Sequence, residues 1–264
     1  MHETTAIDRI LFTQGFGSRR ECAALCRAGR VAVGGRAVDD PQAEFDTEAL
    51  VLEVDGVAWP YRVPAIVMLH KPLGVECSRE PSHHASVFEL LPPPLARRGV
   101  QPVGRLDADT SGLLLLTDDG ALLHRLTSPK RRVAKVYEVT TRHPLTPAML
   151  DALRDGVVLR DDPAPVRAEA AEATGECALR LTLTGGRYHQ VRRMVAAAGN
   201  RVEALHRSGF GPLVLPADLA RGQWRWVDPG ALQDVASTTG AASAADSAGA
   251  SGANRATEAV AAPR

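Results

Sequence analysis

Apolar positions in the first sixty residues change their spacing twice along the chain. Residues 7–11 (IDRIL) carry apolar side chains at helical spacing and run into the two glycines of 15–17, which predicts a first helix. The S-x-x-E pattern that opens 18–29 is a capping box and predicts a second helix. Residues 30–38 (RVAVGGRAV) alternate around two glycines, and 51–56 (VLEVDG) are short and apolar. These stretches predict a tight hairpin and a further strand.

The remainder of the chain mixes strand-like and helix-like periods. Short runs rich in aliphatic and β-branched residues predict strands at 65–70, 135–141 and 177–184. Helical spacing predicts helices over 148–154 and 189–198. A mixture of this kind indicates an α+β fold.

Composition divides the chain into three parts. VAWPYRVPA (57–65) contains two prolines and is predicted to be a linker, which gives an N-terminal domain over 1–58 and a larger domain over 59–232. Residues 233–264 are mostly Ala, Ser, Gly and Thr. Such a segment buries too little apolar surface to order itself, so we expect disorder there.

Length and composition exclude several classes of protein. The 264 residues, 45% of them hydrophobic, suffice for one large domain or two unequal ones. No stretch approaches the ~18 apolar residues of a membrane span, and MHETTAIDRI lacks the apolar core of a signal peptide, so we expect a cytoplasmic protein without a membrane partner. The four cysteines are scattered and form no CxxC pair, which predicts reduced thiols and no metal site. A monomer is the default expectation.

The basic residues are almost all arginine. Lysines and arginines total 31, as do aspartates and glutamates, so the formal net charge is zero. Only three of those 31 basic residues are lysines. Arginine suits bidentate phosphate contacts and stacking on bases, but a biased genome composition produces the same preference. Net charge therefore does not argue for a nucleic-acid partner. A neutral total can still contain local basic patches that bind one.

The second predicted helix separates an apolar face from a basic one. At about 100° per residue, its two cysteines and Leu25 fall on one face. Another arc of about 100° contains the basic residues Arg19, Arg20, Arg27 and Arg30. A solvated arginine face is the alternative, and residues 1–58 hold six arginines against ten carboxylates. Helix, glycine turn, basic helix and hairpin together resemble the small αL-type (S4) RNA-binding domain of ribosomal proteins, which implies that these arginines face RNA.

GRLDADTSGLLLLTDDG (104–120) groups four aspartates around four leucines, and three interpretations compete for it. A calcium loop would use the EF-hand spacing from Asp107 to Asp118. Its ninth position would be Leu115, its last is Asp instead of Glu, and no entering helix precedes it, so we reject a calcium site. A catalytic carboxylate pair needs two carboxyls that face one bond, and Asp118 and Asp119 lie beyond the leucine run at its far turn, so one plausible catalytic carboxylate is left.

The third interpretation assigns chemistry to one carboxylate. Residues 109–112 (DTSG) have the short polar side chains and the glycine of a turn, and 113–116 (LLLL) predict a buried strand. Such a rigid scaffold would hold Asp107 at the mouth of a cleft. The alternative is an ordinary turn aspartate, which the loop by itself favours.

Four motifs in order carry a resemblance to a known family. GRLDADTSG (104–112) resembles the G/H-R-L-D-x-x-T-S-G signature of pseudouridine synthases. MLHKPLGVECS (68–78) is similar to their K-P-x-G segment, KVYEV (135–139) to their K-x-Y-x-V strand, and GGRYHQVRRMVAAAGNRVEALHR (185–207) to their closing motif. With the N-terminal module these motifs span about residues 5–229, and the chain resembles the RsuA family of pseudouridine synthases.

The resemblance implies a fold and a reaction. The expected fold is α+β, with a catalytic domain on a mixed, mainly antiparallel sheet of pseudouridine synthase type behind the small αL-type domain. The expected reaction breaks the N1–C1′ bond of a uridine, in 16S rRNA, and reattaches the uracil through C5. No redox change or group transfer occurs, so no cofactor and no metal is expected. A uridine of 23S rRNA or tRNA, or a noncatalytic role in RNA binding or ribosome assembly, stays open.

The resemblance also assigns residues. Asp107 is the expected catalytic carboxylate, whether it attacks C1′, stabilises positive charge there or removes the C2′ proton. Arg192 is expected to keep Asp107 ionised, and Tyr137 to stack on the extruded base. Arg105 would occupy the space that the nucleotide leaves. The remaining expected cleft and RNA-contact residues are Arg187, His189, Gln190 and Arg193, for which structural or solvated surface positions are the alternative.

Overall fold

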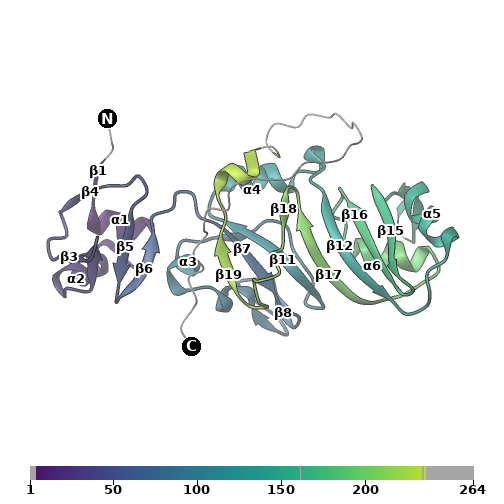
Figure 1. The fold of residues 1–264 in the computed structure, drawn as a ribbon, viewed down its shortest axis with the longest axis horizontal. Coiled ribbons are helices and arrows are strands. Elements are labelled where there is room, and N and C mark those ends of the chain that lie inside the picture. Colours follow the sequence, from purple (N-terminus) through teal and green to yellow (C-terminus); the bar gives the residue numbers. More distant parts are fainter. Residues whose placement is uncertain (1–3, 161, 234, 236–264) are drawn as a thin grey trace.

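The computed structural model describes residues 4–160, 162–233 and 235, and the α+β fold is confirmed in them (Figure 1). A small N-terminal module lies at one end of an elongated molecule. A large sheet fills the middle, and helices α5 and α6 lie at the far end. Almost all of the segment 233–264, expected to be disordered, falls outside the described residues.

The N-terminal module contains the expected helices and hairpin. Helices α1 (Ile7–Thr13) and α2 (Arg19–Arg27) pack beside a sheet of order β3-β2-β5-β6. The strands of the module are β1 (Thr4–Ala6), β2 (Val31–Val33), β3 (Arg36–Ala37), β4 (Glu44–Asp46), β5 (Val51–Val54) and β6 (Val57–Pro60). The capping box is confirmed, because the Glu21 N–H donates to Ser18 Oγ and the Ser18 N–H to the Glu21 carboxylate.

Two local expectations for this module differ from the structure. Helix α2 ends at Arg27, and Arg30 follows Gly29, whose φ is +66°, so the helical period does not set the direction of Arg30. The first residues of the predicted linker form β6, which pairs with β5 and extends the sheet to Pro60. Proline ends a strand at an edge without breaking the pairing before it, which is why the two prolines suggested a linker too early.

The large sheet has nine strands and is mainly antiparallel. Its main path is β15-β16-β12-β17-β11-β7-β19, with β10 beside β11 and β18 beside β17. Only β11 and β17 pair in parallel among the strands of this sheet. The bounds are β7 (Ile66–Lys71), β10 (Gln101–Pro102), β11 (Thr110–Thr117), β12 (Lys135–Thr141), β15 (Ala170–Gly175), β16 (Ala178–Leu183), β17 (Val202–Phe210), β18 (Leu213–Val214) and β19 (Trp224–Trp226).

Short helices and hairpins complete the larger domain. The helices are α3 (Pro93–Arg97), α4 (Gly120–Thr127), α5 (Pro147–Asp155) and α6 (Gln190–Ala197), with 3-10 turns η1 (Val87–Leu90), η2 (Pro129–Arg131) and η3 (Pro229–Leu232). The small strand pairs are β8 (Val75–Glu76) with β9 (Ala85–Ser86), and β13 (Val157–Leu159) with β14 (Asp162–Val166). Helix α6 packs against β13 and β17, which brings its N-terminus to the middle of the sheet.

The leucine run of β11 is apolar throughout because both of its faces are covered. Leu114 and Leu116 belong to a core that continues into the N-terminal module. Leu113 and Leu115 face the opposite way, into a core closed by α4 and η3. Successive side chains of a strand alternate between faces, so a central strand with two cores is apolar at every position.

Strand β11 begins earlier than the turn-like residues predicted. Thr110, Ser111 and Gly112 pair with β17, so the turn lies before Thr110. A Cβ on Gly112 would lie 2.2 Å from the carbonyl oxygen of Arg207. The glycine therefore serves the close approach of two strands, and its φ of +113° is a conformation that other residues rarely adopt.

Candidate active site

Asp107 lies in the loop that connects β10 to β11. The Thr110 N–H donates to the Asp107 carbonyl (N···O 3.0 Å), and the Gly74 N–H donates to the Ala108 carbonyl (2.8 Å). Leu106 is buried and anchors the loop. The Asp107 side chain is 40% exposed, so the carboxylate lies at the protein surface on a fixed backbone.

A cavity of about 550 Å³ opens beside Asp107. Its walls come from the β10–β11 loop, from β12 and β17, and from the start of α6 with the residues before it. Its size is typical of a pocket that holds a small ligand. Of the residues that the sequence pointed to, it is lined by Arg105, Asp107, Tyr137, Arg187, His189, Gln190 and Arg192.

His189 lies beside the Asp107 carboxylate. Its Nε2 lies 3.5 Å from Asp107 Oδ1, and its ring stacks on Tyr188 with centroids 3.8 Å apart. His189 precedes α6 with a φ of +48°, which turns the chain sharply at this point. The expectation that His189 shapes the cleft agrees with this position, but its contact with Asp107 had no signal in the sequence.

Arg192 lies in the cavity wall but pairs with a different aspartate from the one expected. Its Nη2 lies 2.7 Å from Asp109 Oδ2 and 3.2 Å from the Asp109 carbonyl oxygen. Asp109 lies in the turn before β11, where the Thr110 N–H donates to the Asp107 carbonyl, so strand alternation does not set the direction of its side chain. Arg192 therefore fastens α6 to the Asp107 loop in this structure, instead of binding Asp107 itself.

Lys71 is a buried cation beneath the same loop. Its ammonium group donates to the carbonyls of Thr110 (2.9 Å) and Pro72 (3.0 Å). Desolvation lowers the pKa of Lys71, while attraction to Cys77, Asp107 and Asp109 partly opposes that shift. Lys71 thus supports the loop and contributes positive charge close to Asp107.

Tyr137, Arg207 and Lys135 form the floor of the cavity. Tyr137 of β12 pairs directly with Arg207 of β17, and Lys135 pairs with Phe210 two positions away. Arg207 is 1% exposed. Desolvation, and to a lesser degree the charge of Arg207, lowers the pKa of Lys135 to about 8.

The sequence interpretation did not single out Lys71 beneath the Asp107 loop, nor Lys135, Tyr188 and Arg207 in the cavity wall. The available signal was a charge inside an otherwise apolar strand, as in IVMLHK (66–71) and ALHRSGF (204–210). Tyr188 is 73% exposed, and an exposed aromatic beside a cavity is a second usable signal.

The other residues expected in the cleft hold its wall together. Gln190 is buried and accepts a hydrogen bond from the Arg187 N–H (2.9 Å), which closes the turn before α6. Arg187 pairs with Asp162. Arg193 donates to the Tyr188 carbonyl (3.1 Å) and is not among the residues that line the cavity.

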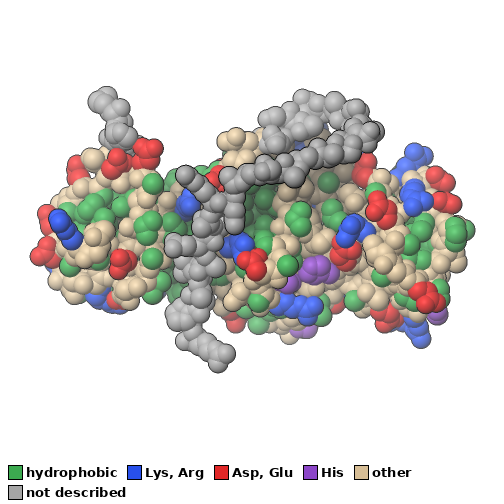
Figure 2. Space-filling model, in the orientation of Figure 1, with side chains coloured by type: hydrophobic (Ala, Val, Ile, Leu, Met, Phe, Trp, Pro, Cys, Tyr) green, Lys and Arg blue, Asp and Glu red, His purple; other side chains and the backbone are tan. Residues whose placement is uncertain are grey.

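The four arginines of the N-terminal module that were expected to face RNA are exposed but not equivalent. Arg19 pairs with Asp8 (2.8 Å) and Arg30 with Asp55 (2.6 Å). Arg20 and Arg27 are exposed on α2. The face of the module seen in Figure 2 shows acidic side chains among the basic ones, as its net acidic composition requires.

The structure does not form the calcium-binding loop that the spacing of the aspartates resembles. Thr110–Thr117 is an extended strand, so Asp107 and Asp118 lie at its opposite ends. Asp118 instead pairs with Arg98 and accepts a hydrogen bond from the Ala65 N–H. Across residues 4–160, 162–233 and 235, no three His, Cys, Asp or Glu side chains gather as metal ligands would.

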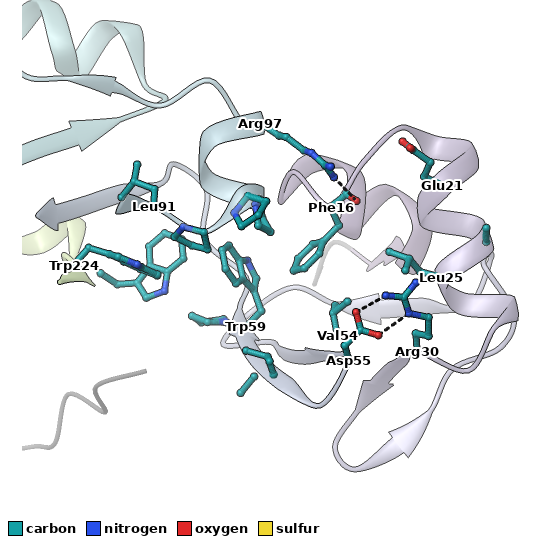
Figure 3. A pocket seen from close by; sticks show the side chains of 18 of the residues that line it. Phe16, Glu21, Leu25, Arg30, Val54, Asp55, Trp59, Leu91, Arg97 and Trp224 are labelled. Atoms are coloured by element: carbon teal, nitrogen blue, oxygen red, sulfur yellow. Dashed lines mark hydrogen bonds and ion pairs between the residues drawn. The ribbon is translucent and has the colours of Figure 1, made fainter. Parts of the chain in front are cut away.

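A larger cavity of about 960 Å³ lies between the N-terminal module and the rest of the chain (Figure 3). Its walls are mostly apolar and aromatic, including Phe16, Trp59 and Trp224. Arg30 and Asp55, two of its charged lining residues, are paired with each other. Asp107, Tyr137 and Arg192 do not line it, so the smaller cavity is the candidate active site.

The described helices include none that is long and apolar enough to span a membrane.

Comparison with family models matches residues 65–197 to RNA pseudouridylate synthase and residues 7–51 to the S4 domain. Asp107, Tyr137 and Arg192 fall within the first match, and Arg207 lies beyond it.

Named relatives span nearly the whole chain. The ribosomal small subunit pseudouridine synthase A of Yersinia pestis is 39% identical over 232 residues, which cover 88% of this chain and 97% of the relative. An uncharacterized RNA pseudouridine synthase of Bacillus subtilis (strain 168), YtzG, is 38% identical over 83% of this chain and 93% of its own. A crystal structure of a pseudouridylate synthase superposes with a TM-score of 0.62 at 31% identity, covering 87% of this chain and 99% of that one. This chain belongs to the RNA pseudouridylate synthase family, and it carries an S4 domain in front of the catalytic domain.

Proposed function

We propose that this protein isomerises a specific uridine of small-subunit rRNA to pseudouridine, with Asp107 as the catalytic carboxylate. One observation carries the proposal: the half-exposed Asp107 carboxylate shares a cavity of about 550 Å³ with Tyr137 inside the stretch that matches the family. The small-subunit target is supported by the names of the relatives from Yersinia pestis and Escherichia coli (strain K12). We expect such an enzyme to act in the cytoplasm.

The reaction needs a carboxylate beside the sugar and a surface that holds the detached base. As the N1–C1′ bond breaks, positive charge develops at C1′, and the Asp107 carboxylate compensates it. Tyr137 lies in the cavity and offers an aromatic face to the uracil. Arg105 is exposed at the cavity edge and would fill the gap in the RNA stack that the extruded nucleotide leaves.

Arg192 has a positioning role in this proposal. Its ion pair with Asp109 holds the loop that carries Asp107 against α6. When RNA enters, the same guanidinium lies in the cavity wall and can balance the Asp107 charge that dehydration would otherwise penalise. His189 caps the cavity above Asp107, with its ring against Tyr188.

RNA selection falls to the N-terminal module. Arg20 and Arg27 are exposed on one side of α2 and suit phosphate contacts. Arg19 and Arg30 must exchange their carboxylate partners for phosphate before they can contribute. Arg187 and Arg193, near the start of α6, are proposed to contact RNA at the cavity entrance.

Mapping of pseudouridines in total RNA tests the proposed target. Cells that lack this protein should lose one pseudouridine in 16S rRNA, and a plasmid copy of the wild-type gene should restore it. Loss of a site in 23S rRNA or in a tRNA instead would assign the enzyme to that RNA. An unchanged map would favour a noncatalytic role in RNA binding or ribosome assembly.

A further inference from the structure

Arg207 is a buried cation with an unused donor. Its Nε donates to the Leu113 carbonyl (2.8 Å), and its guanidinium lies 5.4 Å from the centre of the Phe210 ring. Its Nη2 is buried and has no hydrogen-bond partner among the described residues. Leaving a buried charged donor without a partner costs several times the free energy that a typical hydrogen bond contributes. A side chain in a cavity wall that keeps such a donor is therefore a candidate for ligand binding.

Lys135 places a second cation in the same part of the cavity. Its ammonium group lies 5.7 Å from the centre of the same Phe210 ring and donates to the Val133 carbonyl (3.0 Å). The charge of Arg207 contributes to the lowered pKa of Lys135, which reflects how close the two cations are. Arg207 is buried and Lys135 is half-buried. Two neighbouring cations of this kind repel each other, and an anion between them relieves the repulsion.

The charges of the cavity wall are strongly unequal. Its lining contains one carboxylate, Asp107, and six basic residues: Arg105, Arg132, Lys135, Arg187, Arg192 and Arg207. Three of the arginines are neutralised by carboxylates outside the lining, in the pairs Arg132–Glu169, Arg187–Asp162 and Arg192–Asp109. Arg207 and Lys135 instead donate to backbone carbonyls, which do not neutralise their charge.

The strand register determines which part of a bound nucleotide these cations meet. Arg207 lies directly across from Tyr137 on the neighbouring strand. On its other side it pairs with Gly112, whose missing side chain lets β17 approach β11 closely. If Tyr137 stacks on the uracil, Arg207 lies at an edge of the uracil ring. A backbone phosphate, which stays at the RNA surface, does not reach a side chain that is 1% exposed.

We infer that Arg207 and Lys135 form an anion subsite that holds the uracil ring while it is detached from the sugar. This inference rests on the proposed function. When the N1–C1′ bond breaks, its electron pair stays with the uracil, and the negative charge spreads from N1 to O2 and O4. The two cations stabilise that charge as the ring turns. A C5–C1′ bond then forms, C5 loses its proton and N1 gains one, so the product is an isomer of the substrate.

RNA with 5-fluorouridine in place of the target uridine separates this role from a structural one. Fluorine withdraws electrons and stabilises the detached ring itself, so cleavage of the N1–C1′ bond depends less on the protein. The rate compared on both RNAs is that of this cleavage, followed as loss of the substrate nucleoside, because C5 of 5-fluorouridine has no proton to release. On uridine RNA, Arg207→Met should lower the single-turnover rate by about 10²- to 10³-fold, as for the loss of one donor to a developing anion. On 5-fluorouridine RNA its loss should be smaller by about tenfold or more. Lys135→Met should show the same inequality, and Arg207→Lys should recover part of the rate on uridine RNA.

Arg180→Met is the matched control, because Arg180 lies on the neighbouring β16, is half exposed and pairs with Glu138. It should leave both rates at the wild-type value. Equal losses on the two RNAs for Arg207→Met would overturn the inference, and so would weaker, less salt-dependent RNA binding with an unchanged rate ratio. If Arg207→Met does not fold, the ratios for Lys135→Met and Arg207→Lys decide in the same way. A wild-type protein that forms no pseudouridine would instead refute the proposed function.

Discussion

Three cations of the catalytic domain, Lys71, Lys135 and Arg207, lie in strands of the large sheet. All three donate to backbone carbonyls. A carbonyl satisfies the hydrogen bond but does not cancel the charge, so the positive potential reaches the cavity beside Asp107. Desolvation lowers the pKa of both lysines, which is the cost of this arrangement.

That cost makes stability depend on pH. The pKa of Lys135 is about 8 in the folded protein and 10.5 in its ordinary state. Between these values the unfolded chain binds a proton that the folded chain has released, so the free energy of unfolding should rise with pH. The penalty is fully present below about pH 8 and disappears above about pH 10.5. Urea denaturation across this range should give a flatter profile for Lys135→Met than for the wild type, and parallel profiles would contradict the burial of this charge.

The sequence predicted the main cavity residues but not their pairing. Asp107, Tyr137 and Arg192 could be predicted because each lies in a motif of the family. The partner of Arg192 could not, because Asp107 and Asp109 differ only in the direction in which their side chains leave the loop. The buried positions of Lys71 and Arg207 could not be predicted, because a charged residue within a strand ordinarily faces solvent.

At the scale of elements, the site depends on the parallel contact between β11 and β17. The Asp107 loop leads into β11, and β17 carries Arg207. The two strands meet at Gly112, where any side chain would collide with the Arg207 backbone. One glycine therefore positions the carboxylate end of the cavity relative to its cationic floor.

Gly112→Ala should disrupt this contact. The new methyl group would lie 2.2 Å from the Arg207 carbonyl oxygen at a φ of +113°. Strain and overpacking together should lower the free energy of unfolding by about 3 kcal/mol or more. Gly120→Ala is the control, because nothing lies within 4 Å of its added Cβ, and it should change stability by less than about 1 kcal/mol. Equal effects of the two substitutions in urea denaturation would show that the strand contact is not tight.

Local sequence signals predicted most helices and strands, and they failed where pairing with a distant strand determines the secondary structure. The capping box fixed the start of α2, and the alternation around Gly34 predicted the hairpin. The first residues of β11 were predicted to form a turn, because short polar residues and a glycine are typical of turns. They extend instead because β17 pairs with them. The prolines near β6 hid a strand that its neighbour β5 stabilises.

At the scale of the molecule, a buried polar network joins the N-terminal module to the catalytic domain. Arg98 donates to the side chain of Gln14 (2.8 Å) and to the carboxylate of Asp118 (2.6 Å). Gln14 also accepts a hydrogen bond from the Trp59 indole (3.3 Å). A hydrophobic core continues across the same junction, beside the larger cavity of Figure 3. The junction therefore sets the distance between the N-terminal module and the candidate active site.

Arg98→Met should loosen this junction. The Arg98 side chain is 3% exposed, and its removal leaves the Asp118 carboxylate without its cation. The free energy of unfolding should fall by about 3–5 kcal/mol. Arg97→Met removes an exposed neighbour with one long hydrogen bond to Phe16 (3.4 Å) and should cost less than about 0.5 kcal/mol. Similar urea midpoints for the two variants would show that the network does not bind the domains together.

Asp107→Asn tests the account most directly, because it keeps the size of the side chain and removes only its charge. Single-turnover pseudouridine formation on the mapped rRNA fragment should fall by about 10³-fold or more, while RNA affinity stays at the wild-type value. Asp151→Asn, at an exposed position of α5 away from the cavity, should retain the wild-type activity. Pseudouridine formation by Asp107→Asn at the wild-type rate would contradict the assignment of this carboxylate.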